Sequence, residues 1–260
     1  MSRQSKIIIY QEPEISKVRA AAQASAQVLA RLCSAAQPGM STWQLDQLAL
    51  EFIRETGGES AFFGYHGFPG QICISINEEV VHGIGRRERI IMPGDLLSID
   101  VGVKLAGYIG DNARSICAGQ APKGMAARLL ETTEKSLYAG IAAALPGKQV
   151  RDIGAAVQNL VEKAGMHVVR ELVGHGCGRS MHEAPEVPNF KMAGRSPLLQ
   201  PGMILCIEPM VNVGTHRVVF DQQDQWTVRS RDASLSAHFE HQILITTNQP
   251  EILTRWPKTV

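Results

Sequence analysis

Two stretches of the chain carry nearly the same octapeptide, and each stretch ends in an acid. PGDLLSID begins at residue 93, and PGMILCIE begins 108 residues later, at 201. A second pair keeps this offset: PG at 38 opens a helical pattern that ends at Gly57, and PG at 146 opens one that ends at Gly165. This period is far too long for a solenoid repeat. The duplication therefore predicts one domain of two halves, about 14–118 and 122–247, related by a pseudo-two-fold axis.

Local patterns predict the same order of elements in both halves, two helices followed by strands. This is an α+β pattern with a mainly antiparallel sheet covered by helices on one face. No linker or low-complexity segment separates the halves, so residues 1–260 are predicted to form a single domain. The expected segments are a strand at 6–10, helices at about 13–33, from Ser41 or Thr42 to Gly57, at 122–144 and at 150–164, and strands within 59–118 and up to 247.

Composition excludes several classes of function. Lys and Arg number 26 against 25 Asp and Glu, a net charge of +1, which gives no electrostatic case for a specific nucleic-acid partner. No apolar run approaches the ~18 residues of a membrane span, and the start of the chain lacks the apolar core of a signal peptide. The five cysteines include no CxxC motif. We therefore expect a reduced protein in the cytoplasm.

Two aspartates lie on a predicted β-hairpin, LLSIDVGVKLAGYIGDNARS. A two-residue turn centred on Leu105 and Ala106 would place Asp100 directly opposite Asp111. Directly opposed carboxylates destabilise a hairpin, so this register needs a cation between them or a proton on one of them. If the register slips by one residue, the two acids face opposite sides of the sheet. The hairpin alone leaves both interpretations open.

The repeated octapeptide favours the first interpretation. If Asp100 faces the interior of its half, its counterpart Glu208 faces the equivalent interior, within the apolar stretch MILCIEPMV. Burial of a lone ionised carboxylate there would be very unfavourable. A further acid, Glu240, lies in SAHFEHQILIT, where strand alternation places it on one face with His238 and Gln242. Four acids on aliphatic strands, with few Lys or Arg beside them in sequence, predict a metal centre.

Three of the eight histidines have the setting of functional residues. His175 and His182 lie in VGHGCGRSMHE, among glycines that allow a close approach of the backbone to a ligand. His82 precedes a glycine at the end of a predicted strand. We expect these three at the metal centre. The other histidines are interpreted as packed or solvated residues: His66, His167, His216, His238 and His241.

Several stretches together resemble the bacterial-type methionine aminopeptidases of the short form, without an N-terminal extension. They are GYHGFPGQICISINEEVVHGIG, SIDVG, GDNARS, VGHGCGRSMHEAPEVPN, IEPMVN and DQWTVRSRDASLSAHFEHQILIT, and they span nearly the whole chain. The resemblance implies the pita-bread fold, whose two pseudo-symmetric halves account for the repeated octapeptide. It also implies a hydrolase that removes the N-terminal methionine from peptides and nascent chains whose second residue is small.

The resemblance further implies a site for two divalent ions, of Co, Mn or Fe, with Zn or Ni as further choices. Asp111 and Glu240 would bridge both ions, and Asp100 would complete the coordination of one of them. Oxygen ligands with one imidazole and no thiolate suit such hard or borderline ions. The five implied ligands are Asp100, Asp111, His175, Glu208 and Glu240, with His175 and Glu208 serving the second ion.

Catalytic and substrate-binding roles follow from the same resemblance. Glu208 would be the general base for a bridging water. His82 and His182 would contact the substrate and stabilise the oxyanion or the leaving-group side. The methionine pocket would consist of Tyr65, Phe68, Cys73, His82 and Trp226.

Two alternative functions share this fold. An Xaa-Pro aminopeptidase-like enzyme would use the same five ligands, but such enzymes usually carry a sizeable extra N-terminal domain, and about 13 residues precede the first predicted helix here. A non-enzymatic interaction protein would typically have lost ligands, and none is lost in this chain. We expect a monomer that acts on peptide and nascent-chain N-termini, with transient ribosome contact and no membrane or specific nucleic-acid partner.

Overall fold

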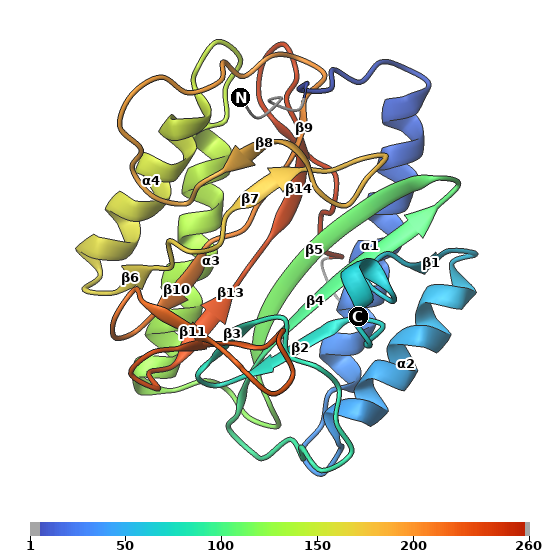
Figure 1. Cartoon of the computed structure of the whole chain (residues 1–260), viewed down its shortest axis with the longest axis vertical. Coiled ribbons are helices and arrows are strands. Elements are labelled where there is room, and N and C mark those ends of the chain that lie inside the picture. The colour runs from blue at the N-terminus through green and yellow to red at the C-terminus, as the bar shows by residue number, and fades with distance from the viewer. Residues whose placement is uncertain (1–5, 258–260) are drawn as a thin grey trace.

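The structure is a computed structural model that describes residues 6–257; the outermost residues of the predicted domain, 1–5 and 258–260, lie outside the described part. Helices form in two pairs, within a few residues of the predicted segments. Figure 1 shows the first pair on one side of the molecule and the second pair on the other, with the strands between them. Among the described helices, none combines the length and the apolar composition that a bilayer-spanning helix requires. The helices are α1 (Glu14–Ala35), α2 (Thr42–Glu55), α3 (Gly124–Ala143) and α4 (Val150–Lys163).

The second helix of each pair shows how closely the halves repeat. α2 begins at a capping box in which the Gln44 backbone N–H donates to Ser41 Oγ and the Ser41 N–H donates to Gln44 Oε1. Each helix buries one apolar stripe, and each fully buried Val, Leu or Ile side chain in such a stripe contributes about 1.5–3 kcal/mol relative to exposure. The stripes fall at the same offset of 108 residues: Leu45, Ala49 and Ile53 in α2, and Ile153, Val157 and Val161 in α4.

The strands form small sheets in which every defined pairing is antiparallel, which confirms the predicted α+β class. One sheet pairs β1, β4 and β2 in that order, with β5 also on β4. The other three run β13-β10-β6, β11-β12-β3 and β15-β14-β9-β7-β8. The bounds are β1 (Glu59–Ser60), β2 (Cys73–Ile76), β3 (Glu79–Val81), β4 (Leu96–Leu105), β5 (Tyr108–Cys117), β6 (His167–Val168), β7 (Gly174–Gly176), β8 (Glu183–Val187), β9 (Ile204–Ile207), β10 (Met210–Asn212), β11 (Val218–Phe220), β12 (Val228–Ser230), β13 (Ser236–His238), β14 (His241–Leu244) and β15 (Glu251–Ile252), with a 3-10 helix η1 (Tyr65–Gly67).

The predicted strand at 6–10 is wrong. This segment pairs with no strand, although the Tyr10 backbone N–H donates to the Gly202 carbonyl at 2.8 Å. The Tyr10 side chain is buried in a cluster with Val18 of α1 and Ile204 of β9. Ile8 also packs against this cluster, whereas Ile7 packs against a separate core cluster and Ile9 is exposed. Burial of part of the segment does not require a strand ladder.

The turn of the long β4–β5 hairpin differs from the prediction. Leu105 pairs with Tyr108, so the turn residues are Ala106 and Gly107, with φ of 50° and 81°. Two-residue hairpin turns of this type require positive φ at both positions, and a glycine adopts positive φ without steric cost. The conformational freedom of Gly107 therefore moves the turn one residue beyond the predicted centre.

The shifted turn changes the relation between the two aspartates. Asp100 pairs with Ala113 and Asp111 pairs with Gly102, so the prediction that the aspartates lie directly opposite each other is wrong by two residues. Side chains alternate with a period of two along a strand, so an even slip keeps both acids on one face. They are diagonal neighbours on that face, and the alternative with the acids on opposite faces is also excluded.

Hydrogen bonds repeat between the halves at the offset of 108 residues. The Gly39 N–H donates to the Ile91 carbonyl at 2.8 Å, and the Gly147 N–H donates to the Leu199 carbonyl at 2.8 Å. Both glycines have positive φ, 93° and 81°. These repeated contacts support our proposal that the chain is a single domain whose halves span about 14–118 and 122–247.

One pair of strands in the second half bends where two acids lie. β9 pairs with β14 in one sheet, whereas the continuing strands β10 and β13 pair with each other in another. The chain changes sheets at Glu208-Pro209 and again at Phe239-Glu240. The prediction of one continuous strand through Glu240 is therefore wrong, and both glutamates lie at the corner between two sheets.

Candidate metal centre

Every residue that the sequence predicts for the site lines one cavity of about 100 Å³. The cavity lies between the β4–β5 hairpin of the first half and the bent strand pair of the second. Two further residues, Phe62 and Met181, complete its wall. The predicted residues that it brings together are Tyr65, Phe68, Cys73, His82, Asp100, Asp111, His175, His182, Glu208, Trp226 and Glu240.

The two halves present their acids from different backbone settings. Asp100 and Asp111 project from the middle of the uninterrupted strands β4 and β5. Glu208 directly follows β9, and Glu240 directly precedes β14. The Glu240 backbone N–H donates to the Ala113 carbonyl of β5 at 2.9 Å, which fixes the corner of the second half against the hairpin of the first.

The ligand atoms fall into two overlapping groups. In each group, atoms that can bind a metal ion lie within 4.8 Å of one another. One group is Asp100, Asp111 and Glu240, and the other is His175, Glu208 and Glu240. Because Glu240 belongs to both groups, the geometry offers two adjacent cation positions with a shared carboxylate.

His175 has the orientation of a metal ligand. Its Nδ1 lies 2.9 Å from the Gly176 carbonyl, a distance at which Nδ1–H donates and leaves the lone pair on Nε2. Nε2 lies 3.4 Å from Glu208 Oε1 and 3.8 Å from Asp111 Oδ2. Burial lowers the pKa of His175 to about 3, so the ring is neutral and these contacts are not ion pairs.

The four carboxylates lack the partners that buried acids need. Within residues 6–257, no Lys or Arg nitrogen lies within 4.0 Å of them. Burial raises the pKa of Asp100 to about 7, and burial together with the neighbouring carboxylates raises the pKa of the other three well above the usual range. Divalent cations would restore the charged forms and satisfy the open oxygens. The buried oxygens without a hydrogen-bond partner are Asp100 Oδ1, Asp111 Oδ1, Glu208 Oε1 and Glu240 Oε1.

The two remaining predicted histidines flank the candidate metal centre. His182 directly precedes β8, with its ring 4.3 Å from that of His175 and its Nδ1 2.8 Å from the Tyr65 hydroxyl. His82 follows β3 with a φ of 59°. Burial lowers the pKa of both histidines, that of His82 to about 4. Both rings are thus neutral near pH 7, and each can donate one N–H.

An apolar wall faces the candidate metal centre. Phe68 and Trp226 meet edge to face with ring centroids 5.1 Å apart. Phe62 was not among the predicted pocket residues. In the structure its ring lies so close to Gly102 that a Cβ at Gly102 would be only 2.5 Å from it. The glycine in SIDVG thus makes room for Phe62, and this is the signal that could have found it. Met181 was also missed, and its position directly before His182 could have indicated it.

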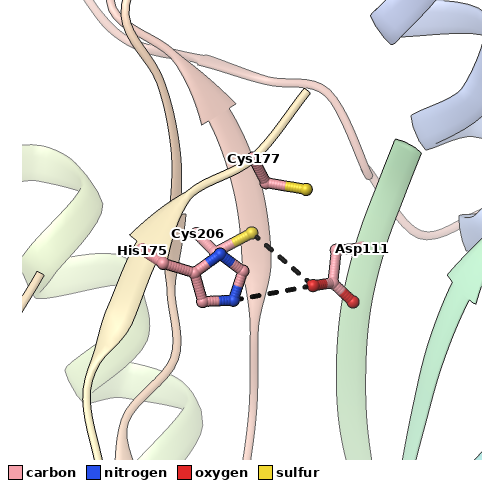
Figure 2. A group of neighbouring side chains, drawn as sticks. All are labelled: Asp111, His175, Cys177 and Cys206. Atoms are coloured by element: carbon pink, nitrogen blue, oxygen red, sulfur yellow. Dashed lines mark hydrogen bonds and ion pairs between the residues drawn. The ribbon is translucent and has the colours of Figure 1, made fainter. Parts of the chain in front are cut away.

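Other buried groups contact the centre without any signal in the sequence spacing. His238, interpreted as packed or solvated, is packed, but its Nε2 lies 3.8 Å from Glu208 Oε2 and neither ring nitrogen has a hydrogen-bond partner. Burial lowers the pKa of His238 to about 3. Cys206 lies beside the centre, with Sγ 3.9 Å from Asp111 Oδ2 (Figure 2). These neighbours come from separate strands, so only the folded chain brings them together.

Comparisons with known proteins agree with this geometry. Residues 16–247 match metallopeptidase family M24. A methionine aminopeptidase of Clostridium acetobutylicum is 46% identical over 248 residues, which cover 95% of this chain and 98% of that protein. The solved methionine aminopeptidase of Thermotoga maritima superposes with a TM-score of 0.93 at 39% identity and covers 96% of this chain and 100% of its own. A prolidase of Pyrococcus furiosus, at 20% identity and a TM-score of 0.77 over 96% of this chain and 66% of its own, shares the fold.

Proposed function

The chain belongs to metallopeptidase family M24 and to its methionine aminopeptidases, and from this premise we propose how its residues carry out the reaction. The protein is a metal-dependent hydrolase that removes the N-terminal methionine from peptides and nascent polypeptides whose second residue is small. The observation that carries the residue assignment is the pair of overlapping ligand groups that share Glu240. The Xaa-Pro peptidase and interaction-protein alternatives are not favoured.

Five residues hold two divalent ions in this proposal. Asp100, Asp111 and Glu240 surround one position, and His175, Glu208 and Glu240 surround the other. Asp111 Oδ2 lies near His175 Nε2, which supports a second bridging role for Asp111. Mn, Fe or Co held by these residues, with Zn or Ni as alternatives, would supply Lewis acidity toward the scissile carbonyl and the attacking water.

Glu208 acts as the general base. It lies at the end of β9, and its Oε1 is buried without a hydrogen-bond partner, so the carboxylate has acceptor capacity that no protein donor uses. Its position beside His175 orients the carboxylate toward the attacking water, from which it accepts a proton. The proton then passes to the leaving amine.

His82 and His182 stabilise charge that develops on the substrate. The Tyr65 hydroxyl lies 2.8 Å from His182 Nδ1. Burial raises the pKa of Tyr65 and keeps the hydroxyl protonated, and we assign it as the donor in this hydrogen bond. The proton of neutral His182 is then on Nε2, where it can donate to the forming oxyanion. His82, whose ring lies 6.4 Å from that of Trp226, contacts the substrate on the side of the apolar wall.

The apolar wall binds the methionine side chain. Aromatic rings and a buried thiol suit a thioether, because sulfur makes favourable contacts with aromatic edges. The cavity of about 100 Å³ is small, and such a pocket distinguishes side chains by about 1–3 kcal/mol per methylene. The proposed pocket residues are Tyr65, Phe68, Cys73, His82 and Trp226, to which the structure adds Phe62 and Met181.

We further propose that the protein acts as a cytoplasmic monomer that contacts the ribosome transiently. Nascent chains are its proposed substrates, and their N-termini emerge at the ribosome. All five cysteines are free, which supports a reducing compartment.

The experiment that tests this function compares the hydrolysis of three peptides by metal-free enzyme to which each ion is added separately. We expect hydrolysis of Met-Ala-Ser with Mn, Fe or Co, and little hydrolysis of Met-Leu-Ser, because the second residue must be small. The expected rate for an Ala-Pro peptide is far lower. A preference for the Ala-Pro peptide would contradict the proposal and favour the Xaa-Pro alternative.

A further inference from the structure

A third group of metal-binding atoms overlaps the candidate metal centre and contains two thiols. Asp111, His175, Cys177 and Cys206 are all buried, and one ligand atom from each lies within 4.8 Å of the others. Figure 2 shows the Cys206 sulfur and the His175 ring both directed at the Asp111 carboxylate, with Cys177 above them. The five ligands that the resemblance implies include no thiol, so Cys177 and Cys206 are two possible metal-binding side chains that the catalytic ion pair does not use.

The strand pairing explains why these side chains meet. Gly176 of β7 pairs with Leu205 of β9. Residues on either side of a paired position point to the opposite face of the sheet, so His175 and Cys177 share a face with Cys206. That face lies against β5, which carries Asp111. The backbone itself therefore presents both thiols toward the same carboxylate.

The two distances to the Asp111 carboxylate are close to those around a single tetrahedral ion. Cys206 Sγ and His175 Nε2 lie 3.9 Å and 3.8 Å from Asp111 Oδ2. Bonds of about 2.0–2.3 Å in a tetrahedral zinc site place neighbouring ligand atoms about 3.3–3.8 Å apart. Small side-chain rotations would close the remaining difference.

A disulfide would not use this geometry. The pairing of Gly176 with Leu205 makes Cys177 and Cys206 diagonal neighbours, and diagonal positions lie about 7–8 Å apart, at the limit of what a disulfide spans. Both thiols are free in the structure. An ion between the sulfurs is compatible with this diagonal spacing, whereas a disulfide would lie at the limit of its reach.

We propose that Asp111, His175, Cys177 and Cys206 form an alternative site for one Zn²⁺ ion, which excludes the catalytic ion pair. Two sulfurs, one imidazole nitrogen and one carboxylate oxygen are a ligand set that selects a soft or borderline tetrahedral ion over Mn²⁺. Both cysteines bind as thiolates, and their two protons pass to the solvent. An ion held there occupies His175 and Asp111, so each zinc-loaded molecule lacks two ligands of the catalytic pair.

X-ray absorption at the zinc edge tests the site directly. The metal-free protein is loaded with one equivalent of Zn²⁺, and the scattering shells around zinc are measured. We expect sulfur neighbours at about 2.3 Å beside oxygen and nitrogen neighbours at about 2.0–2.1 Å. A shell of oxygen and nitrogen alone would overturn the proposal and leave the thiols as packing residues.

Matched variants identify the sulfurs. Cys177→Ala with Cys206→Ala should lose the sulfur shell and weaken Zn²⁺ binding at least about tenfold, since even outer partners of metal ligands contribute about 10–100-fold to affinity. Cys73→Ser changes a buried cysteine of the same cavity outside the group, and it should keep the shell. Sulfur that persists in the double variant, or disappears in Cys73→Ser, contradicts the assignment.

Two checks keep the result independent of folding and of the proposed function. Circular dichroism establishes that the double variant is folded, and Cys206→Ser alone, a smaller change, should halve the sulfur count. The alternative zinc site rests on Asp111 and His175, which the proposed function also uses, but different results would contradict the site and the function. Failure of the manganese-loaded wild type to hydrolyse Met-Ala-Ser counts against the function alone, and a zinc shell without sulfur counts against the alternative site alone.

Discussion

The two halves of the molecule repeat their helices closely and differ in how they hold their acids. In the first half, Asp100 and Asp111 lie on one face of a continuous hairpin of ten-residue strands. In the second half, Glu208 and Glu240 lie where two paired strands bend from one sheet to another. The first copy of the octapeptide therefore ends within an uninterrupted strand, and the second copy ends at a corner between two sheets.

The residues that follow the two octapeptides account for this difference. Asp100 is followed by Val101, which continues the ladder to β5. Glu208 is followed by Pro209, which has no N–H to donate and therefore ends β9. A short aspartate suffices on a rigid strand face, whereas the corner leaves room for the longer glutamate. In the proposed mechanism the first half thus supplies two carboxylates on a fixed strand face, and the second half supplies the general base and the imidazole ligand.

The largest expected effect comes from removing the shared carboxylate of either half. Asp111→Asn and Glu240→Gln should each lower kcat/KM at least about 1000-fold, because loss of metal charge stabilisation costs several kcal/mol. Metal content by plasma mass spectrometry should fall in both. If one variant keeps full metal content and turnover, the two halves do not share the ions as proposed.

A smaller effect is expected beside the ligands of the second half. His182→Ala should retain metal and lose about 10²–10³-fold in kcat, with little change in KM, because a donor to the transition state is removed. Tyr65→Phe should also lower kcat with little change in KM, but by a smaller factor, since it removes only the hydrogen bond that orients His182. Loss of metal from His182→Ala would instead identify this histidine as a ligand.

Metal removal should make the stability of the protein depend on pH. The folded-state pKa of Asp100 is raised to about 7 by burial, so its stabilising effect is present below the unfolded value of about 4 and is lost as the pH rises through 7. Protein treated with a chelator should therefore lose several degrees in Tm between about pH 5 and pH 8. Mn²⁺ should restore the loss.

Variants from each half sharpen this third prediction. Asp100→Asn should remove the part of the Tm loss that Asp100 contributes as the pH rises from its unfolded pKa of about 4 to its folded pKa of about 7. Glu208→Gln should leave that part in place and remove only the part that Glu208 itself contributes, since burial and the neighbouring acids raise the pKa of Glu208 well above its usual range. Identical pH profiles for the two variants would contradict the distinction between the halves.

The smallest effect concerns the helix caps at equivalent positions. Ser41 accepts a hydrogen bond from the Gln44 N–H, whereas Gln149 Oε1 is buried without a partner. Ser41→Ala should lower the free energy of unfolding by about 1 kcal/mol, and Gln149→Ala should change it little. Urea denaturation measures both, and equal losses would show that the caps are equivalent.

Local periodicity in the sequence predicts the elements that depend mainly on neighbouring residues. The four helices and the membership of the site follow from apolar stripes, Pro-Gly turns and motif residues. The hairpin register was wrong by two residues because it depends on which residues of the turn can adopt positive φ, and Gly107 decides this. The assignment of both aspartates to one face survived because the slip was even.

Contacts between residues far apart in the sequence could not be predicted from the sequence alone. The break before Glu240 arises because β13 and β14 pair with different sheets, and no local pattern in SAHFEHQILIT encodes that. The contact of His238 with Glu208, and that of Cys206 with Asp111, join residues of separate strands. Sequence spacing cannot reveal such neighbours without knowledge of the sheet order.

The central claim is that both halves together hold two adjacent ions, and anomalous diffraction from crystals soaked in Mn²⁺ tests it most directly. The expected map has two manganese peaks, one among Asp100, Asp111 and Glu240 and the other beside His175 and Glu208, with Glu240 contacting both. A single peak held by one half alone, or peaks away from Glu240, would contradict the claim.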